Sequence, residues 1–209
     1  MSWWIAHSYP LPCTPMLGWI RTLAANHPKL CRSSVLCETM FSECPMLSIT
    51  DWSSPEKVID ARPVIVISAR VHPGETPGSW MVLGLLTALL GGSADAVKLR
   101  ENVVIRVIPL LNPEGVMLGN YRCSPQGFDL NRCWRKPDPS THPTISAMKQ
   151  LVKTEKLTRE VLMYCDFHSH SRKNDVFIYG CVPDNRPALR GCWGATSTKP
   201  SLSQSSHVN

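Results

Sequence analysis

The segment Val71-His72-Pro73-Gly74-Glu75-Thr76 separates a strand pattern from a helix pattern. Residues 64–70 before it form an apolar, β-branched run that predicts a buried strand. Residues 79–90 after it predict a helix. His72 and Glu75 therefore lie on a turn at the carboxyl end of a strand, where open α/β sheets place their active sites.

His72 and Glu75 can face one metal ion, because imidazole nitrogens and carboxylate oxygens both bind zinc. A third ligand is available at His168, which follows another apolar run at 161–165. Three protein ligands leave a fourth position for water, which is the catalytic arrangement. Taken alone, His72 is more often an ordinary turn histidine. The strand-turn-helix context and the second histidine at a strand end favour a site for one Zn²⁺ ion.

The composition predicts a globular, soluble protein. Hydrophobic residues make up 43% of the 209, and the net charge is +6 with a pI near 8.9. The basic residues are scattered without a Lys/Arg block, so we expect no nucleic-acid partner and only a weak preference for acidic ones. We find no signal peptide and no apolar run of membrane-spanning length, so no membrane association is expected. The nine cysteines lack CxxC pairs, which favours reduced thiols in the cytoplasm over a secreted disulfide framework.

Strand and helix patterns alternate along the chain, which predicts an α/β sheet with helices on its faces. Polar residues at 51–62 predict a loop, and a segment rich in Gly, Asn and Pro predicts a long functional loop at 112–139. The polar residues 183–209 predict a disordered tail. Further helices are expected at 16–25, 93–100 and 143–153, and further strands at 34–39, 46–50, 103–111, 161–166 and 176–180.

The long loop carries further candidate site residues. Asn131 and Arg132 can present an amide and a guanidinium fork to one carboxylate. Asp129 can accept the other ring N–H of a zinc-bound histidine, and Arg122 can stabilise a developing oxyanion. Without the zinc motif, a polar turn with solvated arginines is the plainer interpretation.

Taken together, these motifs resemble the zinc carboxypeptidase family, and within it the cytosolic carboxypeptidase branch. The likeness runs from about residue 30 to about 181 and follows the family's order. A related zinc acylase shares HxxE and a distant histidine, but the NPEG and NYRCS stretches argue against it. The matching stretches are SARVHPGET (68–76), LNPEGV (111–116), GNYRCS (119–124), GFDLNR (127–132) and YCDFHSHS (164–171).

The resemblance implies a role for each candidate residue. His72, Glu75 and His168 would bind one Zn²⁺ ion. Asp129 would orient His72, and Arg122 would polarise the scissile carbonyl. The pair Asn131 and Arg132 would hold the C-terminal carboxylate of the substrate. His170 is expected as a solvent-facing pocket residue, with an exchange of roles with His168 as the alternative.

The resemblance also implies a substrate and a fold. Proteins of this branch remove glutamates from protein tails, tubulin above all, so the expected partners are polyglutamylated tails. The glutamates would be C-terminal or linked through a side chain. The expected location is the cytoplasm, and association with microtubules or cilia is left open. The expected fold is a partial carboxypeptidase-like mixed sheet with helices on both faces, preceded by the remnant of a small β-rich domain at 1–50. Residues 51–182 would be the incomplete catalytic domain.

The likeness to the family ends at about residue 181, beyond the third ligand His168. The family's general base is a Glu on a late strand, with a substrate-capping Tyr before it, and residues 182–209 contain neither Glu nor Tyr. Three hypotheses follow: a metallocarboxypeptidase by descent, a truncated zinc-binding chain with little or no activity, and a non-catalytic binder of acidic tails through Arg132 and Arg122. We also expect an exposed apolar sheet edge and poor solubility.

Overall fold

A computed structural model describes residues 3, 5–6, 8–170, 172–173 and 175–180. Residues 1–169 form one compact unit, and residues from 170 onward form a second. The described residues of the second unit contain no helix or strand. The strand predicted at 176–180 is therefore wrong: the run is apolar, but Val176 and Ile178 are exposed and pair with no strand among the described residues.

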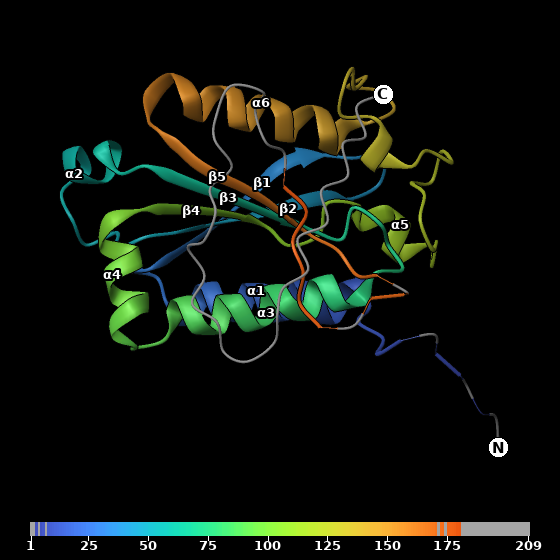
Figure 1. Ribbon diagram of the computed structural model, residues 1–209, viewed down its shortest axis with the longest axis horizontal. Coiled ribbons are helices and arrows are strands. Elements are labelled where there is room, and N and C mark those ends of the chain that lie inside the picture. The colour runs from blue at the N-terminus through green and yellow to red at the C-terminus, as the bar shows by residue number, and fades with distance from the viewer. Residues whose placement is uncertain (1–2, 4, 7, 171, 174, 181–209) are drawn as a thin grey trace. The chain divides into compact units, whose positions relative to one another are not determined.

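The first unit is built on a five-stranded mixed sheet with the order β1-β2-β4-β3-β5 (Figure 1). Strand β2 runs antiparallel to both of its neighbours, β1 and β4, whereas β3 runs parallel to both β4 and β5. This confirms the predicted mixed α/β sheet. The strands are β1 (Cys31–Glu38), β2 (Glu43–Ile49), β3 (Val64–Ala69), β4 (Val104–Ile108) and β5 (Val161–Phe167).

Helices cover both faces of this sheet, as predicted. In Figure 1, α1 and α3 lie on one side of the strands and α6 lies on the other. The α4 helix begins where predicted, because the Ser93 hydroxyl accepts the backbone N–H of Ala96 as an N-cap. The helices are α1 (Cys13–Asn26), α2 (Glu56–Ala61), α3 (Thr76–Leu90), α4 (Ala94–Asn102), α5 (Pro113–Met117) and α6 (Pro143–Thr158), with a 3₁₀ turn η1 (Leu130–Arg132).

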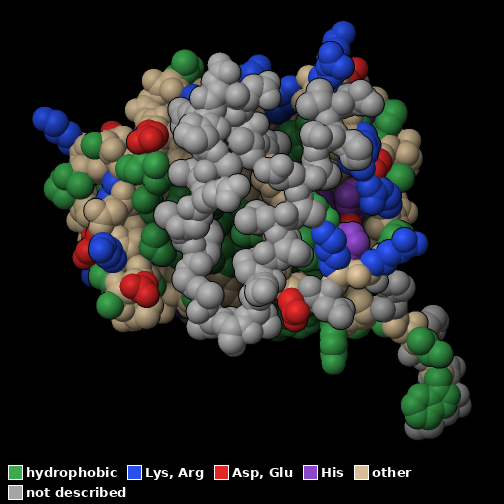
Figure 2. Space-filling view, viewed as in Figure 1, with side chains coloured by type: hydrophobic (Ala, Val, Ile, Leu, Met, Phe, Trp, Pro, Cys, Tyr) green, Lys and Arg blue, Asp and Glu red, His purple; other side chains and the backbone are tan. Residues whose placement is uncertain are grey.

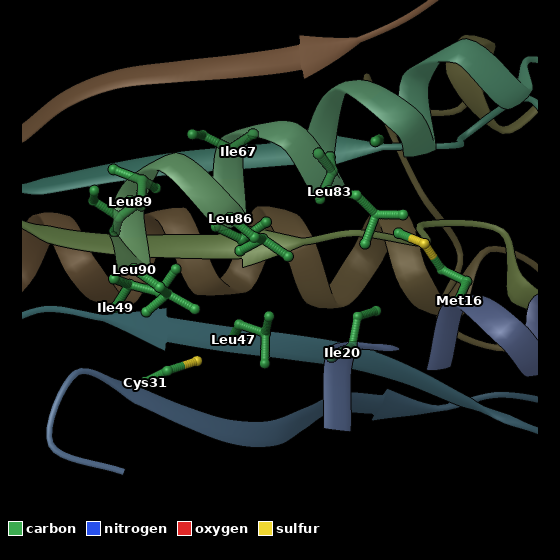
Figure 3. Close-up of a cluster of buried hydrophobic side chains, with 14 of the residues drawn as sticks. Met16, Ile20, Cys31, Leu47, Ile49, Ile67, Leu83, Leu86, Leu89 and Leu90 are labelled. Atoms are coloured by element: carbon green, nitrogen blue, oxygen red, sulfur yellow. The ribbon is translucent and has the colours of Figure 1, made fainter. Parts of the chain in front are cut away.

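Each face of the sheet has its own hydrophobic core. Figure 3 shows Leu83 and Leu86 of α3 and Met16 of α1 pointing toward the strands, where Leu47 and Ile67 belong to the same buried cluster. On the other face, Ile145 and Met148 of α6 pack with Val64 and Val66 of β3. Because β3 is buried on both faces, its sequence is a continuous apolar run rather than an alternating one.

Several predicted boundaries differ from the structure. The polar segment 51–62 contains α2, a short helix that buries only Ile59, so the loop prediction there is wrong. The α3 helix begins at Thr76 rather than at residue 79, because Pro77 is accommodated in its first turn. The strand predicted at 103–111 ends at Ile108. The tail predicted to be disordered at 183–209 lies outside the described residues.

The sheet crosses the expected domain boundary at residue 50. Strand β2 pairs with β4 through Leu47, Ser48 and Ile49. Strands β1 and β2 thus belong to the same sheet as the strands that follow residue 50, and the expected β-rich remnant at 1–50 does not coincide with a break in the sheet.

Among the described residues, no helix taken singly is long and apolar enough to cross a membrane. The pair α3 and α4 meets the length and composition criteria only when joined, and it is bent by 89° at the break.

Candidate zinc site

The turn between β3 and α3 is held by a buried arginine. Arg70 has a positive φ of 63°, a left-handed conformation that side chains rarely adopt. Its Nε–H donates to the Pro73 carbonyl at 2.7 Å, and its Nη1 donates to the Ser79 hydroxyl at 2.9 Å. Burial lowers the pKa of Arg70 to about 10. The side chain thus ties the turn to the start of α3, which fixes where His72 and Glu75 lie.

Two glycines allow other segments to approach this turn closely. The Gly74 N–H donates to the Tyr121 carbonyl at 2.7 Å, and a Cβ on Gly74 would lie 2.6 Å from the Tyr121 ring. A Cβ on Gly78 would lie 2.9 Å from the backbone oxygen of Phe167, at the end of β5. The first contact brings in the loop that carries Arg122, and the second brings the end of β5 against α3.

The three predicted ligands lie together. The His72 Nδ1 atom is 2.7 Å from Glu75 Oε1, and the His168 Nδ1 atom is 3.0 Å from Glu75 Oε2. His72 is buried, whereas the His168 side chain is 31% exposed, so one side of the group is open to solvent. Both histidines therefore direct the same ring nitrogen toward one carboxylate, although they come from the ends of two different strands.

The outer nitrogen of each histidine contacts a second carboxylate. The His72 Nε2 atom is 3.1 Å from Asp129 Oδ1, which agrees with the orienting role predicted for Asp129. The His168 Nε2 atom is 2.7 Å from Asp166 Oδ2. Sequence reasoning missed Asp166. The available signal was its position two residues before His168, because side chains two residues apart in extended backbone lie on the same side.

The electrostatics of the group follow from these contacts. Burial of the Glu75 carboxyl opposes its ionisation, but hydrogen bonds from His168, His72 and the Ser169 backbone N–H outweigh it and hold the pKa of Glu75 well below its usual range. Burial likewise opposes a charge on His168, but the Asp166 and Glu75 carboxylates raise the pKa of this imidazole to about 10. An anionic carboxylate flanked by two imidazoles is a suitable binding site for a metal cation.

The donor set fits zinc. One ligand atom from each of His72, Glu75 and His168 lies within 4.8 Å of the other two. Zinc bonds to nitrogen and oxygen are about 2.0–2.2 Å long, so an ion between these atoms would need only small side-chain movements. Two imidazoles and one carboxylate are also a donor set that suits zinc and leaves a fourth position for water.

The predicted substrate-side residues surround Asp129. The Arg122 Nε–H donates to Asp129 Oδ2 at 2.7 Å, and 43% of the Arg122 side chain is exposed. The Trp134 indole N–H donates to Asn131 Oδ1 at 2.9 Å, which orients the amide and leaves its NH₂ group for another acceptor. Arg132 is exposed on η1. The same loop thus carries the partner of His72 and the groups expected to bind a carboxylate.

His170 belongs to the second unit, where its Nδ1 accepts the Arg172 backbone N–H at 3.1 Å and its ring packs edge-on against Phe177. Its expected place in a substrate pocket remains a prediction.

A further residue without a predicted role fastens the loop after β4 to the metal-site turn. The Asn112 amide donates to the Val71 carbonyl at 3.2 Å, and its oxygen accepts the Gly115 N–H at 3.1 Å as the N-cap of α5. A Cβ on Gly115 would lie 2.5 Å from Pro73. The NPEG stretch (112–115) therefore packs closely against the turn that carries His72 and Glu75.

Comparisons with known proteins agree with this geometry. A family model described as zinc carboxypeptidase matches residues 16–185. The chain is 42% identical over 184 residues to human cytosolic carboxypeptidase 2, covering 87% of this chain and 20% of that protein. It is also 42% identical over 190 residues to mouse cytosolic carboxypeptidase 1, covering 85% of this chain and 15% of that protein. The chain therefore spans about a fifth or less of the length of these curated relatives.

Solved structures show the same fold. The metallo-carboxypeptidase from Burkholderia cenocepacia superposes with a TM-score of 0.68 at 26% sequence identity, over 78% of this chain and 42% of that one. The match to the family model covers most of the chain and includes every residue of the His72, Glu75 and His168 group. The chain belongs to the zinc carboxypeptidase family.

Proposed function

We propose that this chain binds one zinc ion through His72, Glu75 and His168 and takes part in the hydrolysis of C-terminal peptide bonds of acidic protein tails. The observation that carries the proposal is the contact of both Nδ1 atoms with opposite oxygens of Glu75, at 2.7 and 3.0 Å. Bound zinc would lower the pKa of a coordinated water to about 7 and polarise a carbonyl.

The loop after β4 supplies the groups for substrate binding. Arg132 is exposed, and the Asn131 amide is oriented by Trp134, so the two can bind a terminal carboxylate with a guanidinium and an NH₂ group. Arg122 is fixed by Asp129 and is open to an incoming carbonyl oxygen, where its charge would stabilise an oxyanion.

We propose polyglutamylated tails, those of tubulin among them, as the substrate class. The support is the basic character of these side chains and the similarity to cytosolic carboxypeptidases. The same similarity supports a cytoplasmic location, which we include in the proposal. An acidic tail would bring several carboxylates to a surface that carries Arg122, Arg132 and Arg135.

A second candidate function is zinc binding with little or no hydrolysis. The observation that favours it is that the carboxylates at the described site already have hydrogen-bond partners. Glu75 contacts both histidines, Asp129 contacts His72 and Arg122, and Asp166 contacts His168 and Ser68. Each is therefore engaged, and none is placed to accept a proton from a zinc-bound water. Binding of acidic tails without cleavage is the third candidate.

One paired experiment separates these functions. Zinc stoichiometry is measured on the purified chain, and glutamate release is measured on a peptide that ends in several glutamates, with His72→Ala as the inactive control. Bound zinc with release above that control supports hydrolysis, and bound zinc without release supports the second candidate.

Fluorescence anisotropy of the same peptide tests the third candidate. Binding that persists after zinc removal and is lost in Arg132→Ala supports it. The charge-matched variant Arg21→Ala, at an exposed position on α1, should bind as the wild type does. A wild-type chain that binds neither zinc nor the peptide would contradict the proposed function.

A further inference from the structure

Asp166 is placed by the sheet itself. It lies on β5 directly opposite Ser68 of β3 in the parallel register. Its Oδ1 accepts the Ser68 hydroxyl at 2.6 Å, and its Oδ2 is 2.7 Å from His168 Nε2. Its side chain is 15% exposed. One carboxylate thus joins a buried position on β3 to a predicted zinc ligand.

A hydroxyl behind Ser68 completes the arrangement. The Tyr164 hydroxyl lies 2.8 Å from the Ser68 hydroxyl, which is fully buried. A serine hydroxyl has a single hydrogen, and that of Ser68 is given to Asp166, so the Tyr164 O–H donates to Ser68. The chain of donors runs from Tyr164 through Ser68 to Asp166. It leaves the second oxygen of Asp166 to accept the N–H of His168.

The two carboxylates that contact the histidines differ in their location and in their other partner. Asp129 lies on a loop and also contacts Arg122, an exposed side chain expected to meet substrate. Asp166 lies within the sheet, and its other partner is a buried hydroxyl. The orientation of His168 is thus set by the core of the protein, whereas that of His72 is coupled to the substrate side of the site.

We propose that Asp166, held by Ser68 and Tyr164, is the positioning residue of His168 and fixes its Nδ1 toward the metal. The inference rests on zinc binding at the proposed site. With Nε2–H donating to Asp166, the Nδ1 lone pair is left for the ion, and the ring cannot rotate without losing that hydrogen bond.

Asp166→Asn tests this role with little change in shape. The amide offers one acceptor oxygen, so it cannot accept from both Ser68 and His168. Zinc affinity, measured by competition with a chromophoric chelator, should fall about 10- to 100-fold, as for other groups that orient a metal-bound histidine. The visible spectrum of the Co²⁺-substituted chain should also change, because it reports the geometry of the ligands rather than the stability of the fold.

Two further variants guard against a simple folding defect. Asp60→Asn, at an exposed carboxylate, should leave zinc affinity and the Co²⁺ spectrum unchanged. Tyr164→Phe removes one oxygen at the far end of the hydrogen-bonded chain and should weaken zinc binding a few-fold while the chain still folds. If Asp166→Asn does not fold, the zinc affinity and the Co²⁺ spectrum of Tyr164→Phe test the positioning role of Asp166.

The outcomes separate this inference from the proposed function. A wild-type chain that bound no zinc would overturn both. A wild-type chain that binds zinc, with unchanged affinity and an unchanged Co²⁺ spectrum in Asp166→Asn, or in Tyr164→Phe where the first variant does not fold, would overturn the inference alone.

Discussion

His72 and His168 contact opposite oxygens of the Glu75 carboxylate, and their ring centroids lie 5.0 Å apart with the planes inclined at 56°. The two rings come from the ends of β3 and β5, neighbouring parallel strands that end at the same edge of the sheet. A shared carboxylate between two imidazoles is thus a direct consequence of the strand order.

Substitution of the shared carboxylate should abolish tight zinc binding. Glu75→Gln keeps the shape of the side chain but removes its negative charge, so zinc affinity should fall by more than the about 10- to 100-fold expected for an outer residue. Chelator competition and metal analysis of the dialysed chain measure this. Glu56→Gln, at an exposed position on α2, serves as the control, and equal losses in both variants would argue against a site at Glu75.

Zinc should stabilise the folded chain, and its removal should reverse the effect. The ligands come from distant parts of the sequence and meet only when β3, α3 and β5 are assembled, so the ion binds the native state. At a zinc concentration 100 times Kd the gain is about 2.7 kcal/mol. Thermal unfolding with zinc and with excess EDTA measures it. A melting temperature that zinc fails to raise, or that His72→Ala leaves equally sensitive to zinc, would contradict the assignment.

The close approach of α3 to the end of β5 should be required for zinc binding. In Gly78→Ala the new Cβ would lie 2.9 Å from the Phe167 carbonyl, which must move, and Glu75 would shift away from His168. Zinc affinity and stability should both fall. Gly84→Ala is the matched control on the same helix, where a Cβ meets nothing within 4 Å. That variant should gain about 0.5–1 kcal/mol in unfolding free energy and keep its zinc affinity.

A buried carboxylate on α6 should stabilise the packing of this helix on the sheet. Glu155 lies 2.8 Å from the Arg106 Nε of β4 and 3.2 Å from the Arg159 Nε, and its side chain is only 7% exposed. Glu155→Ala leaves two arginines without this partner and should cost roughly 3 kcal/mol, as measured by urea unfolding. Asp60→Asn removes the charge of an exposed carboxylate near Arg159 and should change the stability by no more than about 0.5 kcal/mol. Equal effects would contradict the assigned role of burial.

The cysteines should differ in reactivity. The seven described cysteines are all free. A hydrogen bond from Cys44 lowers the pKa of Cys37, whereas burial raises the pKa of Cys31 to about 11. The thiolate is the nucleophile, so iodoacetamide at pH 8 should modify Cys37 well before Cys31. Peptide mass mapping over time measures the order, and the reverse order would contradict the prediction.

The outer strand β5 should limit the solubility of the chain. Among the described residues β5 pairs only with β3, and Leu162, Met163 and Tyr164 are 49%, 46% and 39% exposed. Figure 2 shows hydrophobic side chains on the face that carries β5 in Figure 1. Leu162→Lys should reduce concentration-dependent aggregation in sedimentation velocity. Val97→Lys, on an exposed part of α4, should not. A wild-type chain that stays monomeric at high concentration would contradict the prediction.

Local sequence patterns are sufficient to predict the elements around the site. The apolar run of β3, the turn with His72 and Glu75, and the helix after it are all encoded within residues 64–90, where periodicity and turn chemistry act without distant partners. The helix cap at Ser93 and the third ligand, His168 after β5, were predictable for the same reason. The order of the motifs was also sufficient to indicate the family.

Contacts between residues far apart in the sequence depend on how the strands and helices assemble. The pairing of β2 with β4 joins residues before and after position 50 in one sheet, and no local pattern encodes that partner. The apolar run 176–180 resembles a strand, but a strand needs a neighbour, and the described residues provide none. Asp166 acquires a role only because the β3–β5 register places it opposite Ser68 and in contact with His168. Spacing along the chain limits which residues can be ligands, whereas strand register determines which groups hold them in position.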